Sequence, residues 1–206
     1  MAFDPSGAYG PETFVEDMRF TLQELGISSA VVIGWSVGGS IAARFAVEHP
    51  DLVSAVALVD NNPPGSPAHS DRSMIDALLR DLNEDFAGAG VRRHVDLFFP
   101  EQGSDIECLK EWLYVIARHT APGAIIGIRK RPAEADPLRW HTQLRQPVLL
   151  LQGGASLLGG RAMGEYLAGV IPHAQLHVFD GKGHAPFLTA AAEFNRVLAG
   201  FVRSVS

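Results

Sequence analysis

Ser36 has the sequence surroundings of a serine that acts as a nucleophile. It lies in the run Gly-Trp-Ser-Val-Gly-Gly at positions 34–39. An apolar, strand-like run, residues 30–33, precedes it, and a helix-like run, residues 40–46, follows it. Gly-x-Ser-x-Gly between a strand and a helix is the pattern that raises a serine hydroxyl on a sharp, strained turn. We therefore expect Ser36 to attack a carbonyl carbon.

The neighbours of Ser36 are expected to complete this turn. Small residues two positions before and two after the serine let strand and helix pass close together, a role we assign to Gly34 and Gly38. The turn aims the backbone N–H of Val37 at an oxyanion. Trp35 would flank the acyl group. The alternative is an ordinary glycine-rich turn between a strand and a helix.

His184 is the candidate general base for this serine. It stands at the tip of a glycine-bearing loop, residues 180–184, directly after a strand-like run at 175–179. A histidine in such a loop can exchange protons near neutral pH. Because His184 follows Ser36 in the chain, the order of the two residues also fits a serine, acid, histidine triad.

These motifs resemble those of the α/β-hydrolase superfamily. Within it, the chain is most similar to the methyl ester esterases that act on pimeloyl-acyl-carrier protein and to related carboxylesterases. The resemblance rests on the run at 34–39, on His-Ala-Pro-Phe at 184–187 with Ala-Glu-Phe at 192–194, and on the strand-loop run at 147–153. It covers residues 2–60 and 143–203. It implies an α/β-hydrolase fold, with a mostly parallel sheet, flanking helices and a helical cap insertion.

The acid of the triad is where the chain departs from this family. The family has Gly-x-x-Asp after the strand at 147–151, whereas this chain has Ser156 at the position of the aspartate. A hydroxyl can accept a hydrogen bond from the imidazole but supplies no negative charge, and loss of the carboxylate costs on the order of 10⁴ in turnover. Some relatives carry the acid after the strand that follows the nucleophile helix, and here Asp60 holds that place. Asp60 could instead be a loop-capping residue, so the acid is Asp60, Ser156 or absent.

The beginning of the chain differs from the family pattern as well. Residues 2–7 resemble the end of the family's fourth strand, and residues 11–25 read as the helix after it. We expect the chain to be N-terminally truncated relative to the family, without the loop that gives the first oxyanion donor. The strand at 30–35 would then be an exposed apolar edge, open to pairing in a homo-oligomer.

Strand-like and helix-like runs alternate on both sides of an insertion, which predicts a parallel sheet with right-handed crossovers. We divide the chain into a core, residues 1–65 and 141–206, and a helical cap insertion, residues 66–140. The expected strands of the core are 30–35, 53–59, 147–151 and 175–179, and its later helices are 161–170 and 190–202. The expected helices of the cap are 73–86, 91–99, 106–119 and 122–131.

The cap carries two groups of residues that could contact a substrate. Phe98, Phe99, Trp112 and Tyr114 could line an acyl pocket or form the cap's own small core, which we favour for most of them. Arg92, Arg93, Arg118 and residues 129–131 make the cap basic. In the family such residues meet an acidic carrier protein; a solvated helix face is the alternative and the interpretation that we favour.

Composition narrows the function further. The 206 residues are 47% hydrophobic and 19% charged, as in a globular domain, and the net charge of −6 argues against nucleic-acid binding. Cys108 is the single cysteine, which excludes an intramolecular disulfide. No run has the length of a membrane span, and no signal peptide, metal-ligand spacing or phosphate-binding loop is found. We expect a cytoplasmic protein without metal or cofactor.

The sequence therefore predicts a serine hydrolase that cleaves carboxylic esters through an acyl-enzyme on Ser36, with His184 as general base. Its substrate would be a small-molecule ester with a small or medium acyl chain, which an acyl carrier protein could carry. One alternative is a catalytically degenerate or truncated scaffold that binds a ligand or partner. Another is a thioesterase, acyltransferase or perhydrolase that uses the same residues, since a fold does not fix the chemistry.

Overall fold

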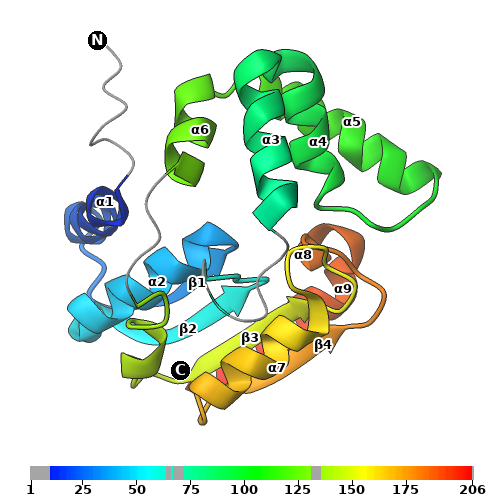
Figure 1. The fold of residues 1–206 in the computed structure, drawn as a ribbon. Helices are drawn as coiled ribbons and strands as arrows, with labels where there is room; N and C mark the ends of the chain where they lie inside the picture. The colour runs from blue at the N-terminus through cyan, green and yellow to red at the C-terminus, as the bar shows by residue number, and fades with distance from the viewer. Residues whose placement is uncertain (1–9, 64–65, 67–71, 131–135, 206) are drawn as a thin grey trace.

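A computed structural model describes residues 10–63, 66, 72–130 and 136–205. Within them, four parallel strands form one sheet in the order β1-β2-β3-β4 (Figure 1). The strands are β1 (Ala30–Trp35), β2 (Val53–Val59), β3 (Val148–Gly153) and β4 (Gln175–Phe179). All four arise where the sequence predicts them, because each is an apolar run of strand length bounded by turn residues.

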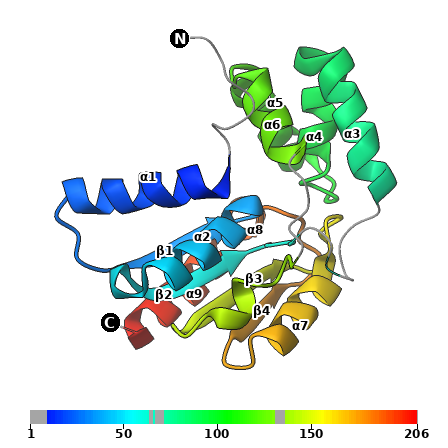
Figure 2. The same cartoon turned by 60° about the vertical axis from the view of Figure 1, so that its left-hand side comes forward.

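Helices cover both faces of this sheet (Figures 1 and 2). The helices of the core are α1 (Pro11–Glu24), α2 (Val37–Glu48), α7 (Gly160–Val170), α8 (Pro186–Thr189) and α9 (Ala191–Val205). The predicted core helices are confirmed, although the last one extends to Val205 and the short α8 precedes it. The expected strand end at residues 2–7 lies outside the described residues.

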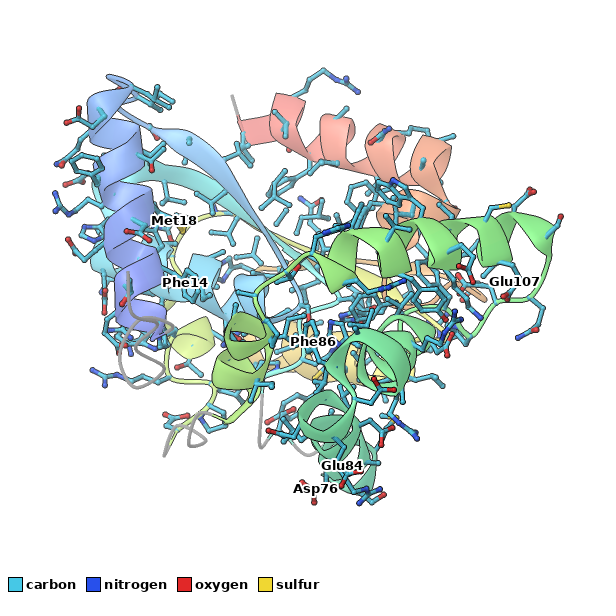
Figure 3. All side chains as sticks on the ribbon, turned by 90° about the horizontal axis from the view of Figure 1, so that it is seen from above. Phe14, Met18, Asp76, Glu84, Phe86 and Glu107 are labelled. Atoms are coloured by element: carbon cyan, nitrogen blue, oxygen red, sulfur yellow. The ribbon has the colours of Figure 1, made fainter. Side chains whose placement is uncertain are left out.

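The two faces of β2 explain why the sheet is buried on both sides. Side chains alternate along a strand, so Val56 and Leu58 point to the face covered by α2 and α7, with Met163 of α7 in the same cluster. Ala57 points to the other face, where Phe194 of α9 packs. Met18 of α1 packs at the margin of the first cluster, outside α2 (Figure 3). Because helices cover both faces, functional side chains of the sheet can reach a substrate only at the ends of its strands.

The insertion forms a separate group of helices beyond one end of the sheet (Figures 1 and 2). Its elements are α3 (Arg72–Glu84), a π-helical turn η2 (Phe86–Gly90), α4 (Val91–Asp96), α5 (Ser104–Arg118) and α6 (Pro122–Lys130). They share a hydrophobic cluster, which includes Leu78, Leu82 and Val95, with Phe86 at its margin (Figure 3), and which Ala185 from the loop after β4 joins. The expected single helix at 91–99 is wrong at its end, because α4 stops at Asp96. The division into core and cap stays a prediction.

Strand β1 lies at one edge of the described sheet, where it pairs with β2 alone. The side chain of Ile33 in this strand is 50% exposed, which agrees with the predicted apolar edge.

In the described ranges, no helix is both long and apolar enough to cross a membrane.

Candidate active site

Ser36 lies on a strained turn between β1 and α2. Its backbone has φ 54° and ψ −124°, a conformation that a residue with a side chain rarely adopts. Its N–H donates to the carbonyl oxygen of Val59, at 2.9 Å, which ties the turn to the end of β2. Val37 is the first residue of α2, and the N–H groups of a helix's first turn have no partner within the helix. This is the geometry predicted for a serine nucleophile with an oxyanion donor beside it.

The glycines around Ser36 divide their roles differently from the prediction. A Cβ on Gly34 would lie closer to the Gly38 carbonyl oxygen than van der Waals contact allows, so Gly34 is needed for the close passage of strand and helix. A Cβ on Gly38 would meet nothing within 4 Å, so the expected need for a small residue there is wrong. The second position without room is Gly39, where a Cβ would lie 2.6 Å from Asn61.

The sheet register brings Asp60 beside Ser36. Trp35 of β1 pairs with Val59 of β2, so the next residue of each strand, Ser36 and Asp60, leaves the same end of the sheet. Asp60 also has a positive φ, 41°, and its N–H donates to the carbonyl oxygen of Leu151, at 2.8 Å. The carboxyl ends of parallel strands are where ligands bind in sheets of this kind.

The side chain of Asp60 accepts four hydrogen bonds, two of which come from the other candidate residues and one from Nδ2 of Asn62, at 3.2 Å. Its Oδ1 accepts from Nδ1 of His184 at 2.7 Å and from the hydroxyl of Ser156 at 2.8 Å. Its Oδ2 accepts from the N–H of Gly153 at 2.8 Å. The side chains of Asp60 and His184 are both 0% exposed. Ser156, which we expected at the family's acid position, donates to a carboxylate that directly follows the neighbouring strand.

The bond to Asp60 sets the tautomer of His184. A carboxylate only accepts, so Nδ1 of His184 carries the hydrogen and Nε2 is left with a free lone pair in the neutral ring. Nε2 is buried and has no hydrogen-bond partner among the described residues. The imidazole can therefore take a proton at Nε2 while Asp60 stabilises the resulting charge.

Aromatic residues hold the imidazole from two sides. Nε1 of Trp35 donates to the carbonyl oxygen of His184, and the N–H of His184 donates to the carbonyl oxygen of Phe98, each at 2.8 Å. The ring centroids of Trp35 and Phe98 lie 5.3 and 5.1 Å from that of His184. Of the three expected substrate-binding residues, the structure thus places Trp35 and Phe98 against the base. Phe99 is 2% exposed inside the cap cluster, as in the alternative that we favoured.

Residues that the sequence analysis missed support both ends of this arrangement. Asn61 donates through Nδ2 to the carbonyl oxygen of Ser36, at 2.8 Å, and its Oδ1 faces Nε2 of the buried His141, at 2.7 Å. On the base side, Oε1 of Glu101 accepts from the N–H of Gly183 at 2.8 Å. A polar residue directly after a candidate acid was the available signal for Asn61. Nothing near Glu101 in the sequence indicated its contact.

A polar groove of about 400 Å³ lies on the cap near the loop after β3. Its lining residues are Asp81, Ala89, Arg92, Arg93, Asp96, Leu97 and Leu157. Arg93 forms an ion pair with Asp81, and Arg92 lies 4.6 Å from the ring centroid of Tyr114. Burial, followed by the hydrogen bond to Asp96, raises the pKa of Tyr114 to about 12. The charged side chains of this groove are thus already paired, Arg93 with Asp81 inside it and Arg92 and Asp96 with residues outside its lining. In the described part of the chain, no cluster of histidine, cysteine and acidic residues could hold a metal.

Comparison with known proteins places this geometry in a family. A family model described as alpha/beta hydrolase fold matches residues 4–100. The pimeloyl-[acyl-carrier protein] methyl ester esterase of Chromobacterium violaceum is 30% identical over 175 residues, which cover 82% of this chain and 68% of that protein. The chain belongs to the α/β-hydrolase family. The protein of the same name from Vibrio vulnificus is 28% identical over 91% of this chain and 75% of its own length.

Solved structures show the same fold in this α/β-hydrolase. A bromoperoxidase from Bacillus anthracis superposes with a TM-score of 0.86 at 21% identity, over 98% of this chain and 77% of its own. An esterase from Exiguobacterium antarcticum gives 0.84 at 20% identity, over 97% and 76%. The predicted family and fold class are confirmed, and so is the predicted enzyme class, carboxylic ester hydrolase. The expected N-terminal truncation and the roles of the site residues stay predictions.

Proposed function

We propose that this α/β-hydrolase cleaves carboxylic esters through an acyl-enzyme on Ser36, with His184 as general base and Asp60 as the acid. The observation that carries the proposal is the buried hydrogen bond of 2.7 Å between Asp60 and His184. It lies at the same end of the sheet as the strained Ser36. The carboxylate that the family's usual position lacks is thereby supplied from the adjacent strand.

The proposed reaction gives each of these groups one role. The hydroxyl oxygen of Ser36 attacks the ester carbonyl carbon while Nε2 of His184 takes the hydroxyl proton. The negative charge on the carbonyl oxygen is stabilised by the N–H of Val37. The tetrahedral intermediate then collapses, and the alkoxide leaves with the proton from His184. Water attacks the acyl-enzyme with His184 again as base, and the carboxylic acid leaves Ser36 unchanged.

Ser156 supports the acid in this proposal. Its hydroxyl donates to the same Asp60 oxygen that accepts from His184, and it also accepts from the N–H of Leu158 at 3.3 Å. The hydroxyl therefore helps to hold the carboxylate oxygen that accepts from the imidazole. Ser156→Ala should lower kcat by about tenfold, as loss of a supporting contact does. Replacing Asp60 by asparagine should cost much more.

Mass spectrometry and ester kinetics test the proposal together. The purified chain is incubated with a fluorophosphonate, and its intact mass is compared with that of Ser36→Ala. We expect one adduct on the wild type and none on the variant. On a short-chain p-nitrophenyl ester, Asp60→Asn should lower kcat by about 10⁴, because the amide supplies no negative charge and its NH₂ would face the N–H of either His184 or Gly153. Asp180→Asn, an exposed aspartate after β4, is the matched control.

The outcomes separate the alternatives. A folded wild type that forms no adduct and hydrolyses no ester would favour the non-catalytic scaffold. Full activity in a folded Asp60→Asn would refute the assignment of the acid. Hydrolysis of a thioester, transfer to an added alcohol, or peracid formation with hydrogen peroxide would identify the thioesterase, acyltransferase or perhydrolase alternatives, which use the same acyl-enzyme.

A substrate carried on an acyl carrier protein is the second candidate, because the relatives are named for such an ester. The cap's basic residues give it limited support. Arg92 of α4 faces Glu111 of α5 at 3.6 Å, and the exposed Asp76 and Glu84 of α3 and Glu107 of α5 add negative charge to the cap (Figure 3). We therefore propose the free ester first. Comparison of kcat/KM for a methyl ester in free form and on an acyl carrier protein decides between the two.

A further inference from the structure

The peptide group between Ser36 and Val37 links the nucleophile to the oxyanion donor. A trans peptide is planar, so the carbonyl of Ser36 and the N–H of Val37 point in opposite directions. The carbonyl oxygen accepts from Nδ2 of Asn61 at 2.8 Å and from the N–H of Gly39 at 2.9 Å. Whatever holds this carbonyl therefore also sets the direction of the Val37 N–H.

Asn61 is itself held in place on all sides. It is 1% exposed, and its Nδ2 also donates to the hydroxyl of Ser40 at 3.1 Å. Its side chain packs against Gly39 so closely that a Cβ there would lie 2.6 Å away. Its Oδ1 lies 2.7 Å from Nε2 of His141, which comes from the short η3 helix (His141–Gln143) after the cap.

The carbonyl of Ser36, which can only accept, turns the NH₂ of Asn61 toward it, and His141 reinforces that orientation from the other end of the amide. Burial lowers the pKa of His141 to about 4, so the ring is neutral near pH 7 and carries one hydrogen. The partner of Nε2 is an acceptor, so that hydrogen is on Nε2, and Nδ1 has no hydrogen-bond partner among the described residues. A flipped Asn61 amide would place its NH₂ against the donor of His141 and its oxygen against the carbonyl of Ser36. Both contacts would be repulsive.

We propose that Asn61 and His141 are positioning residues for the oxyanion site, which orient the Val37 N–H by holding the far side of its peptide group. The inference rests on the proposed function. It differs from a general stabilising role, because its effect falls on the transition state. The Val37 N–H should meet the oxyanion more strongly than the ground-state carbonyl, so loss of its orientation should lower kcat and leave KM nearly unchanged.

Two pairs of variants test this inference. Asn61→Asp keeps the shape of the side chain but removes the donor to Ser36, and we expect kcat to fall by about 10²–10³ with KM within about twofold. Affinity for a trifluoromethyl ketone, which forms an anionic adduct with the serine, should fall by the same factor. His141→Leu, which frees the amide to flip, should lower kcat by about tenfold, and His141→Gln should recover part of that loss because it can donate to Asn61. Asn83→Asp and His173→Gln, at exposed positions, are the matched controls.

A second measurement does not depend on turnover. The amide resonance of Val37 in a ¹H–¹⁵N spectrum should shift in Asn61→Asp and His141→Leu and stay in place in the two controls. An unmoved Val37 resonance in folded variants, or equal losses in kcat and in ground-state binding, would overturn the inference while the esterase proposal stands. Full esterase activity in Ser36→Ala would instead refute the proposed function, and the Val37 resonance would still decide the positioning role. If Asn61→Asp does not fold, the two His141 variants decide it.

Discussion

The buried His141 makes the stability of the protein depend on pH in a predictable way. Burial lowers the pKa of His141 from 6.5 to about 4, and the ring is 1% exposed. Between these two values the unfolded chain binds the proton and the folded chain does not. The free energy of unfolding therefore falls as the pH is lowered from above 6.5 toward 4. Above pH 7 both states are neutral at this residue, and its contribution no longer changes.

The size of the effect follows from the two pKa values. A full separation of this kind corresponds to about 3 kcal/mol, of which roughly 2.5 kcal/mol is lost between pH 7.5 and pH 4.5. For a chain of this length, such a loss lowers the melting temperature by about 5–10 °C. Other groups titrate over the same range, so the quantity to compare is the pH dependence of the wild type minus that of His141→Gln, which has no titrating group at this position.

Urea unfolding, followed by tryptophan fluorescence at pH 7.5 and pH 4.5, measures that difference. We expect the wild type to lose roughly 2.5 kcal/mol more than His141→Gln over this interval. His173→Gln, which removes an exposed histidine, should behave like the wild type. Equal losses in wild type and His141→Gln would refute the reasoning, because they would mean that His141 is protonated equally in the folded and unfolded chain.

Three further predictions follow from single contacts. Glu101→Ala leaves the Gly183 N–H without its acceptor, so kcat for an ester should fall by about tenfold. Glu101→Gln keeps an acceptor and should retain most of the wild-type kcat. Equal kcat values for Glu101→Ala and the wild type would contradict this role. Gly34→Ala should lower the free energy of unfolding, measured in urea, by about 3 kcal/mol or more. Gly38→Ala, where a Cβ has open space, should leave it unchanged or raise it. Similar losses in the two variants would contradict the close packing at Gly34. The exposed β1 edge should cause concentration-dependent association in light scattering that Ile33→Lys reduces, and a monomeric wild type at every concentration would refute it.

The sheet and its helices could be predicted because their sequence signals are local. Strand β2 reads as seven consecutive small or apolar residues, the pattern of a strand covered on both faces, and it is buried on both. Proline at position 50 and glycine at position 26 mark the ends of helices in the same local way. Parallel order then follows from the alternation of strands and helices, without knowledge of any long-range contact.

The ends of the cap helices could not be predicted in this way, because they depend on side-chain and long-range hydrogen bonds to the backbone. Residues 86–90 form a π-helical turn, with the side chain of Asp85 accepting from the N–H groups of Gly88 and Ala89. The helix predicted over 73–86 ends earlier, at Glu84, because apolar spacing carries no information about such a turn. The helix predicted over 91–99 likewise ends early, where Phe98 turns its carbonyl oxygen to the N–H of His184.

The acid of the triad could not be identified from the sequence, which left Asp60, Ser156 or no acid as alternatives. Asp60 and His184 are 124 residues apart, and no local pattern states that they meet. The sheet register brings them together: Val59 of β2 pairs with Leu151 of β3, so the loops that follow these two strands lie beside the same histidine. A carboxylate from either loop can then reach Nδ1 of His184, and the other loop need supply only a donor to that carboxylate. In this chain Ser156 is that donor, which is why a serine can occupy the family's acid position without removing the charge from the site.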